Sequence, residues 1–315
     1  MQAEIAKSTY SSIPTKSVSS GILARAKDYY LLAKPKVLVL LLVSTVCPMF
    51  LAAAGPVSIQ LIFFTLLGGA LISGSAAAIN CVWEADTDRL MERTKNRAVA
   101  AGRLSPMQGA AFAVIIGMIG LLVMTVFVNP VAASISLFGH FFYVFVYTIW
   151  LKPITPQNIV IGGAAGAVPP MVGWAAVSGS ITLSSLLLFA IIFLWTPPHF
   201  WALALNKNAD YRRAGIPMLP VVAGESITHR QMLAYAVSLL PVSMLLVLSN
   251  DSLGWFSMTV LLVLGVVFAW KTYELKCLGE DANEEKVAKA WDVFSFSLIY
   301  LTAFFVCLVV DSLVI

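Results

Sequence analysis

Three side chains that carry oxygen atoms, Asn80, Glu84 and Asp88, recur every four positions where a long apolar segment gives way to acidic residues. Positions i, i+4 and i+8 share one face of a helix, so these side chains are expected to lie together. Carboxylates packed near a bilayer repel each other unless a cation lies among them. Oxygen ligands at this density suit Mg²⁺, which usually also binds substrate phosphates. The alternative interpretation is a solvated helix end.

A second polar cluster follows the pair Pro197-Pro198, which should kink its helix. If the helix continues beyond the kink, then His199, Asn206 and Asp210 fall on one face, at i, i+7 and i+11. Both clusters end outward-to-inward spans of about 30–35 Å, so they are expected at the same depth. Two oxygen-rich helix ends beside Lys and Arg residues predict a site for an anion with Mg²⁺.

The composition indicates an all-α polytopic membrane protein, because 59% of the 315 residues are hydrophobic and only 11% are charged. A polar tail at 1–36 precedes a membrane domain at 37–315, and the four scattered cysteines suggest neither a disulfide framework nor zinc. No nucleic-acid partner is expected. Nine runs can cross about 30 Å of hydrocarbon: 37–55, 57–83, 107–128, 131–151, 158–178, 183–206, 231–249, 253–270 and 292–311.

The basic residues predict how the chain is oriented in the membrane. All 20 Lys and Arg residues fall in the tail or in the connections after spans two, four, six and eight. Because cytoplasmic loops carry the excess of Lys and Arg, these segments are expected in the cytoplasm and the C-terminus outside. The tail lacks the features of a secretory signal, and a bacterial inner membrane is favoured over a mitochondrial one.

Carboxylates with Mg²⁺, flanked by Arg and Lys, form a site that can bind a diphosphate and stabilise it as a leaving group. At the mouth of an apolar helical bundle, this site suits a diphosphate with a lipid tail. Loss of the diphosphate would leave an allylic carbocation, which aromatic walls can shield from water. The residues alone therefore predict a transferase that acts on a prenyl diphosphate.

The stretch from Asn80 to Asp88 resembles the Asn-x-x-x-Asp-x-x-x-Asp motif of the intramembrane prenyltransferases of the UbiA superfamily, which have nine helices. Further stretches resemble the branch of that superfamily that attaches farnesyl to haem: 88–97, 147–148 with 151–152, 155–163, 198–204, 210–211 and 216–220. The resemblance implies farnesyl diphosphate and haem B as substrates, Mg²⁺ as cofactor and a hydroxyethylfarnesyl product. It also implies contact with membrane lipid and hand-over of the product to haem A synthase or a terminal oxidase.

Site residues follow from the motifs and the resemblance together. Asn80, Glu84, Asp88, Lys152, Asn206 and Asp210 are expected to act in catalysis, with Asn80, Glu84, Asp88 and Asp210 as metal ligands. Substrate contacts are expected from Arg93, Lys95, Arg97, Tyr147, Asn158, His199, Trp201 and Tyr211. Two departures from the superfamily pattern matter. Glu84 stands where Asp is common, and the second motif reads Ala202, Asn206, Asp210 instead of three Asp.

Two residues carry more specific expectations. Asp88 is expected at the wet end of its helix, so Asp88→Asn should keep the fold and remove turnover. His199 should lie about 10 Å from Asn206, too far to share its metal. It is therefore expected to serve the haem acceptor, as an iron ligand or a hydrogen-bond donor, and a buried structural histidine is the alternative.

Three rival functions remain open at this point. A prenyltransferase with another aromatic acceptor, such as a hydroxybenzoate, shares the same diphosphate chemistry. A transporter or channel would place ionisable residues at the bilayer midplane, whereas most here fall at the cytoplasmic interface. A haem carrier without chemistry would leave the carboxylate cluster without a use.

Overall fold

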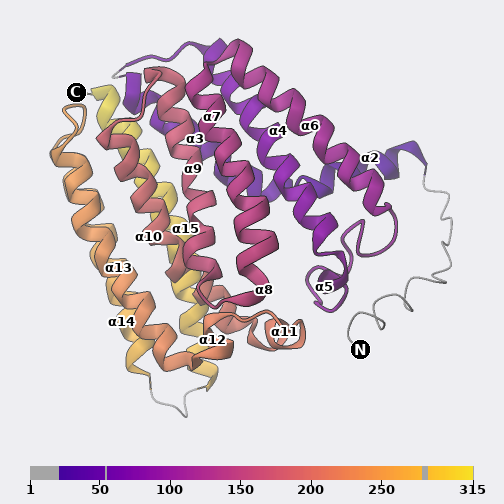
Figure 1. Ribbon diagram of the computed structural model, residues 1–315. Coiled ribbons are helices and arrows are strands. Elements are labelled where there is room, and N and C mark those ends of the chain that lie inside the picture. The colour runs from indigo at the N-terminus through magenta and orange to yellow at the C-terminus, as the bar shows by residue number, and fades with distance from the viewer. Residues whose placement is uncertain (1–20, 54, 279–282, 315) are drawn as a thin grey trace.

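The computed structural model describes residues 21–53, 55–278 and 283–314, and these ranges form helices and no strand (Figure 1). Nine helical segments in the described ranges are long and apolar enough to cross a membrane, as the sequence predicts. They are α3 (Pro35–Ala53), α4 (Ile59–Trp83), α6 (Pro106–Phe127), α7–η1–α8 (Pro130–Ile154), α9 (Asn158–Ser178), α10 (Leu183–Asn206), α13 (Gly224–Leu248), α14 (Trp255–Cys277) and α15 (Asn283–Val314). The chain is thus an all-α, multi-pass membrane protein.

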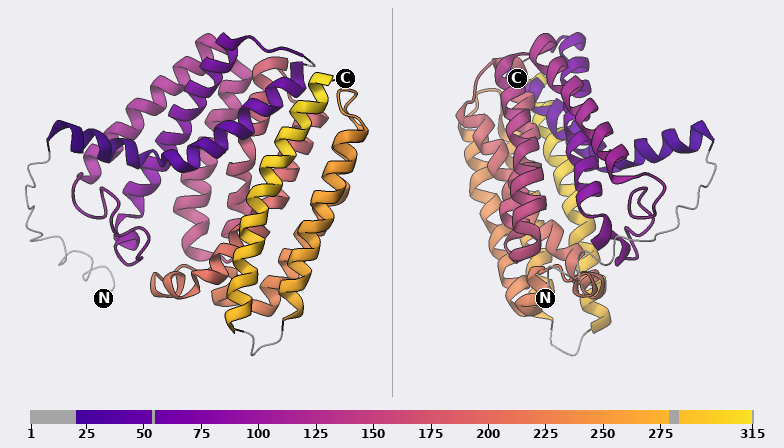
Figure 2. Two further views of the ribbon diagram at one scale, coloured as in Figure 1. Left: turned by 180° about the vertical axis from the view of Figure 1, so that it is seen from behind. Right: turned by 45° about the vertical axis from the view of Figure 1, so that its right-hand side comes forward.

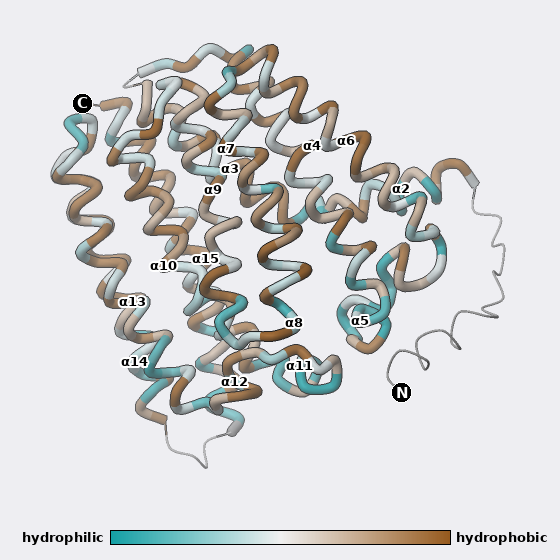
Figure 3. Tube along the Cα trace, in the orientation of Figure 1, coloured by the Kyte–Doolittle hydropathy of each residue, from teal (hydrophilic) through white to brown (hydrophobic). Residues whose placement is uncertain are grey.

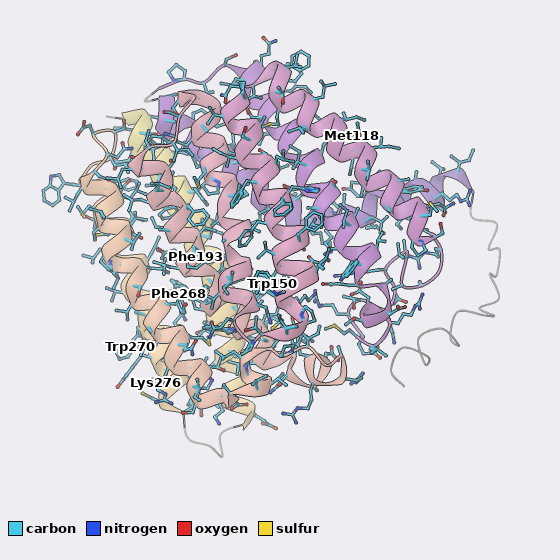
Figure 4. All side chains as sticks on the ribbon, viewed as in Figure 1. Met118, Trp150, Phe193, Phe268, Trp270 and Lys276 are labelled. Atoms are coloured by element: carbon cyan, nitrogen blue, oxygen red, sulfur yellow. The ribbon has the colours of Figure 1, made fainter. Side chains whose placement is uncertain are left out.

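Short helices gather at one end of the bundle, which we call the basic end because it carries the connections 89–104, 152–157 and 207–223. They are α5 (Ala85–Arg89), α11 (Asn208–Arg213) and α12 (Leu219–Val222). Hydrophilic residues colour this end around α5 and α11, whereas the spans above are mainly hydrophobic (Figure 3). Apolar side chains such as Met118 of α6 face outward there (Figure 4), where they suit contact with lipid.

Helix α2 (Ile22–Leu32) precedes the first span and projects from the side of the bundle (Figure 2). The composition of residues 1–36 predicts a polar tail and does not reveal this helix. Its exposed residues include Ile22, Leu23 and Tyr30 as well as Arg25 and Lys27. A helix with exposed apolar and basic side chains beside a membrane span suits the interface between lipid and water.

The last two spans extend further towards the basic end than hydropathy predicts. The sequence places their ends there at 270 and 292, whereas α14 continues to Cys277 and α15 begins at Asn283. Ion pairs explain the extension, because Lys271 bonds Asp292 at 2.6 Å and Lys289 bonds Glu274 at 2.8 Å. The charged segments of both helices are therefore stabilised by each other outside the apolar layer, near Trp270 and Lys276 (Figure 4).

Helix α9 lies at the centre of the bundle, where it packs against α3, α7, η1 and α10. Its small residues permit close approach, as expected for the Gly-rich fifth span. A Cβ atom at Gly173 would lie 1.8 Å from the carbonyl oxygen of Thr45 in α3. The contact between α3 and α9 therefore depends on the absence of a side chain at this position.

Gly173→Ala is expected to destabilise the protein strongly, because the clash involves backbone and cannot be relieved by a rotamer change. Overpacking of this kind costs about 1–3 kcal/mol or more. Thermal unfolding of the detergent-solubilised protein measures the effect. Gly166→Ala on the same helix is the control, since a Cβ atom there meets nothing within 4 Å. Equal unfolding temperatures for the two variants would contradict the prediction.

Candidate active site

A cavity of about 520 Å³ opens among α3, α4, α7, η1, α9, α10 and α15 and reaches the basic end. Five cations but only two carboxylates line it: Lys34, Lys36, Arg93, Arg97 and Lys152 against Glu84 and Asp88. Its deeper part is lined mainly by aliphatic and aromatic side chains, among them Ile72, Val172, Ile192 and Trp195. The cavity therefore combines an anion-binding end with an apolar interior.

The hydroxyl groups along the apolar part do not make it polar. Ser44 and Thr45 both donate to the carbonyl of Leu41, Ser136 donates to Ala132, and Thr196 donates to Ile192. Each of these hydrogen bonds stays within one helix, which satisfies the hydroxyl locally. The walls thus present mostly carbon to a bound molecule.

The three residues of the first motif lie together at the basic end and line the cavity, as their spacing predicts. They are buried, with 2%, 8% and 2% of Asn80, Glu84 and Asp88 exposed. The helix does not run straight through them, however. Helix α4 ends at Trp83, Glu84 has φ −90° and ψ 9°, and α5 follows. The motif stays on one side because Glu84 N–H donates to Asn80 and Asp88 N–H donates to Glu84.

Each motif residue is bonded to a basic side chain from another part of the chain. Arg97 Nη1 contacts both carboxylate oxygens of Asp88 at 2.7 and 2.8 Å. Lys152 Nζ lies 2.5 Å from Glu84 Oε1, and Lys34 Nζ lies 2.5 Å from Asn80 Oδ1. Asp88 is therefore buried and paired, which makes the expectation of a position at the wet end of the helix wrong.

Lys34 lines the cavity, although its position in the sequence does not predict a place in the site. It joins α2 to α3 with a left-handed backbone (φ 53°), which costs a non-glycine residue about 1–2 kcal/mol. The turn points the ammonium at Asn80, and burial lowers the pKa of Lys34 from its ordinary value. The only signal in the sequence is a basic residue directly before the proline that opens the first span.

The fourth span ends in a π-helix, η1 (Phe142–Leu151), and Lys152 follows it directly at the cavity. Hydropathy cannot reveal a π-helix. In an α-helix, Tyr143 and Lys152 would lie about two and a half turns apart, on opposite faces. The wider π turn, closed by i→i+5 bonds such as Lys152 N–H to Tyr147, brings both to the cavity. Tyr147 also lines it, its ring pressed against Gly162, where a Cβ atom would lie 2.1 Å away.

The second motif is not on one helical face. Helix α10 ends at Asn206, Lys207 leaves helical geometry at φ −119° and ψ 21°, and Asp210 belongs to the separate helix α11. Neither Asn206 nor Asp210 lines the cavity, and Asp210 lies 3.8 Å from Arg213. The expected continuous helix is wrong, because the Asn-Lys-Asn sequence ends α10 before its periodicity reaches Asp210.

Two connections contribute to the cavity wall at the basic end. Tyr211 comes from the connection after span six, and Arg93 comes from the loop after α5. Burial raises the pKa of the Tyr211 phenol, and the nearby Arg93 guanidinium opposes that rise. No carboxylate is paired with Arg93 in the described ranges. Its charge is therefore available to a bound anion.

Three other expected site residues lie outside the cavity wall. Lys95 is exposed and paired with Glu92 at 2.5 Å. Asn158 is fully buried and donates to the carbonyl of Thr155 beside the start of α9. Trp201 is fully buried, with its ring 5.8 Å from that of Tyr235.

The cavity also contains two histidines. His199 of α10 has 9% of its surface exposed, and His140 comes from a different helix, α7. Each uses one ring nitrogen for a serine, since His199 Nδ1 contacts Ser297 at 2.7 Å and His140 Nε2 contacts Ser75 at 3.1 Å. Both histidines are therefore ordered parts of the cavity.

Comparison with known proteins defines the class first. Residues 40–309 match the model of the UbiA prenyltransferase family, so the chain belongs to this family and is a prenyltransferase. The match confirms the family predicted from the motifs. Among curated relatives, the protoheme IX farnesyltransferase of Gloeobacter violaceus is 47% identical over 92% of this chain and 93% of its own. That of Trichodesmium erythraeum is 45% identical over 93% and 88%.

Solved structures share the fold at low sequence identity. A digeranylgeranylglyceryl phosphate synthase superposes with a TM-score of 0.75 and 16% identity over 92% of this chain and 99% of its own. A UbiA homologue from Archaeoglobus fulgidus bound to GPP and Mg²⁺ gives 0.63 and 14% over 89% and 99%. These neighbours confirm a helical bundle of the UbiA type, to which the described ranges contribute nine candidate spans.

Proposed function

We propose that this protein transfers farnesyl from farnesyl diphosphate to a vinyl group of haem B, on the cytoplasmic side of a bacterial inner membrane. The observation that carries the proposal is the two-part cavity, which is basic and oxygen-rich at one end and apolar with aromatic walls beyond. The relatives that are 42–47% identical over nearly the whole chain bear the name of this activity. The segregation of Lys and Arg supports the orientation.

The basic end suits the diphosphate. The two carboxylates of the cavity cannot balance the charge of its five cations. A bound diphosphate would balance the remaining positive charge of the Lys and Arg side chains. Arg93 can bind it without losing another carboxylate partner. Arg97 and Lys152 hold Asp88 and Glu84 until the anion arrives.

The donor set fits magnesium. Asn80, Glu84 and Asp88 offer only oxygen atoms to the cavity, which is the ligand type that Mg²⁺ prefers. In the described ranges no three His, Cys, Asp or Glu side chains group as a metal site, so an ion here would also depend on the amide oxygen of Asn80 and on oxygens of the substrate. A bound Mg²⁺ supplies neutralisation of the charge that develops on the departing diphosphate. Asn206 and Asp210 are also expected to act in catalysis, but they do not line the cavity, so they would act through the residues that do.

The transfer balances as an addition across the vinyl group. The bond between farnesyl C1 and oxygen breaks, and its electron pair leaves with the diphosphate. The vinyl electrons form the new carbon–carbon bond, and the cation next to the macrocycle takes up water and releases a proton. The hydroxyethylfarnesyl product is a lipid-tailed haem, which would stay in the membrane for haem A synthase or a terminal oxidase.

The proposal is tested with purified protein in vesicles that contain farnesyl diphosphate and Mg²⁺. Haem B and 4-hydroxybenzoate are offered as acceptors side by side. The products are separated by chromatography and identified by mass spectrometry. We expect a farnesylated, hydrated haem, no prenylated benzoate, and loss of the haem product when EDTA replaces Mg²⁺. Prenylated benzoate without a haem product would show that the acceptor is assigned wrongly.

A further inference from the structure

The ring of His199 is held in one orientation by aromatic neighbours. It stacks on Trp195 with ring centroids 4.3 Å apart and on Phe294 at 4.8 Å, and the ring of Phe200 stands perpendicular to it at 5.4 Å. Trp195 and Phe200 come from the same helix, whereas Phe294 comes from α15. Because two aromatic rings stack against the imidazole, its edge is the part left to interact with a ligand.

The hydrogen bonds of Ser297 determine which nitrogen of His199 carries the proton. Ser297 Oγ lies 2.5 Å from the carbonyl oxygen of Phe294 and 2.7 Å from His199 Nδ1. A hydroxyl group has a single hydrogen, and a carbonyl can only accept, so that hydrogen is donated to Phe294. Ser297 must then accept from Nδ1–H, which leaves Nε2 with a free lone pair on a neutral ring.

Nε2 of His199 is unbonded, and it is not among the buried side-chain atoms of the described ranges that lack a partner. No hydrogen-bond partner of Nε2 occurs in the described ranges, although His199 lines the cavity. A histidine with only a packing role would be expected to satisfy both of its nitrogens when buried. His140 differs, because its Nε2 is bonded to Ser75, and in the described ranges no second hydrogen bond of this serine determines which of the two atoms donates. The two histidines are therefore not equivalent as ligands.

A neutral imidazole that donates Nδ1–H to an oxygen and presents Nε2 is the arrangement in which histidine ligates transition metals. The partner oxygen fixes the tautomer and the ring orientation. Within this apolar cavity, a metal brought by a flat aromatic macrocycle suits the aromatic surroundings of His199, and α10 places the ring about 10 Å from its end at Asn206. The ring is thus some two turns away from the basic end.

We propose that His199 Nε2 is the axial ligand of the iron in the porphyrin acceptor, and that Ser297 is a positioning residue that holds its tautomer. This inference rests on the proposed function for the identity of the acceptor. Iron ligation fixes the macrocycle at one depth in the cavity, beyond the diphosphate. Recognition then depends on the metal as well as on the shape of the ring.

The test is an optical and electron paramagnetic resonance titration of the purified protein with ferric haem B, without farnesyl diphosphate. The wild-type protein should give a histidine-ligated spectrum. His199→Ala should lose that spectrum and bind haem at least about tenfold more weakly, and added imidazole should restore the spectrum. Metal-free protoporphyrin IX should bind both proteins equally, since it offers no iron to ligate.

Two further variants separate ligation from structure. Ser297→Ala should keep histidine ligation but weaken it, with a shifted ligand-field spectrum and unchanged protoporphyrin binding. His140→Ala should leave the haem spectrum as in the wild type. An unchanged spectrum in His199→Ala, loss of the histidine spectrum in His140→Ala instead, or equal weakening of haem and protoporphyrin binding would overturn the assignment.

Failure of this inference and failure of the proposed function give different results. A protein that binds haem through His199 but yields no farnesylated haem would retain the ligand assignment and lose the function. A protein that farnesylates haem without a histidine-ligated spectrum would retain the function and lose the ligand assignment.

Discussion

Asp88→Asn is expected to lose turnover by about 10²–10³-fold and, in addition, to lose stability. The turnover loss follows because the site loses one anionic ligand for the Mg²⁺ that neutralises the departing diphosphate, an effect of about 3–4 kcal/mol on the transition state. The stability loss follows because Arg97, only 22% exposed at its side chain, would remain without its carboxylate. Removing one partner of a buried pair costs on the order of 3 kcal/mol.

A second substitution separates the two effects. Arg97→Gln in the Asp88→Asn background removes the unpaired charge, so the unfolding temperature should recover while turnover stays low. Turnover is measured as farnesylated haem per unit time, and stability as thermal unfolding in detergent. Asp86→Asn is the matched control, because this carboxylate in the same helix is exposed and is paired with Arg89 on the surface. Near-normal turnover for Asp88→Asn would show that the Asp88 carboxylate is not needed for the reaction.

Hydropathy and the positions of basic residues predict most of the fold, because each span must bury its backbone polar groups within a helix of limited length. The ends are harder to predict where tertiary contacts decide them. The extension of α14 and α15 depends on pairs such as Lys271–Asp292, which join residues far apart in the chain. Helix α2 escapes detection because its apolar residues are too few for a span and gain stability only at an interface.

Local spacing predicts the first half of the site and fails for the second. Asn80, Glu84 and Asp88 come together because backbone bonds bridge the break at Glu84. The same argument fails at Asp210, where the backbone turns at Lys207. Partner choice is not a local property either, so the pairing of the oxygens with Lys34, Arg97 and Lys152 is visible only in the folded chain.

The π-helix is the feature of the site that sequence periodicity hides most completely. An apolar run such as Phe142–Leu151 can cross a membrane as an α-helix or as a π-helix. Sequence periodicity cannot distinguish the two, because it is read with 3.6 residues per turn. With that assumption, Lys152 points away from Tyr143. The position of its ammonium beside Glu84 therefore comes from the extra residue in each turn of η1.

Lys152→Met is expected to lower turnover by about 10²–10³-fold, because it removes a cation aimed at the diphosphate end of the cavity. It should also raise the concentration of inorganic pyrophosphate needed to inhibit the reaction, since the product anion uses the same charge. Lys152→Arg should recover part of both properties. Lys276→Met is the control, because this exposed lysine on α14 does not line the cavity.

Pyrophosphate inhibition distinguishes this role from a purely structural one. If Lys152 served only to neutralise Glu84, 9% exposed at its side chain, its loss would lower the unfolding temperature and leave inhibition by pyrophosphate as in the wild type. If it binds the diphosphate, inhibition weakens even in a variant that unfolds at the normal temperature. Unchanged turnover together with unchanged inhibition would show that the lysine carried to the cavity by η1 has no part in the reaction.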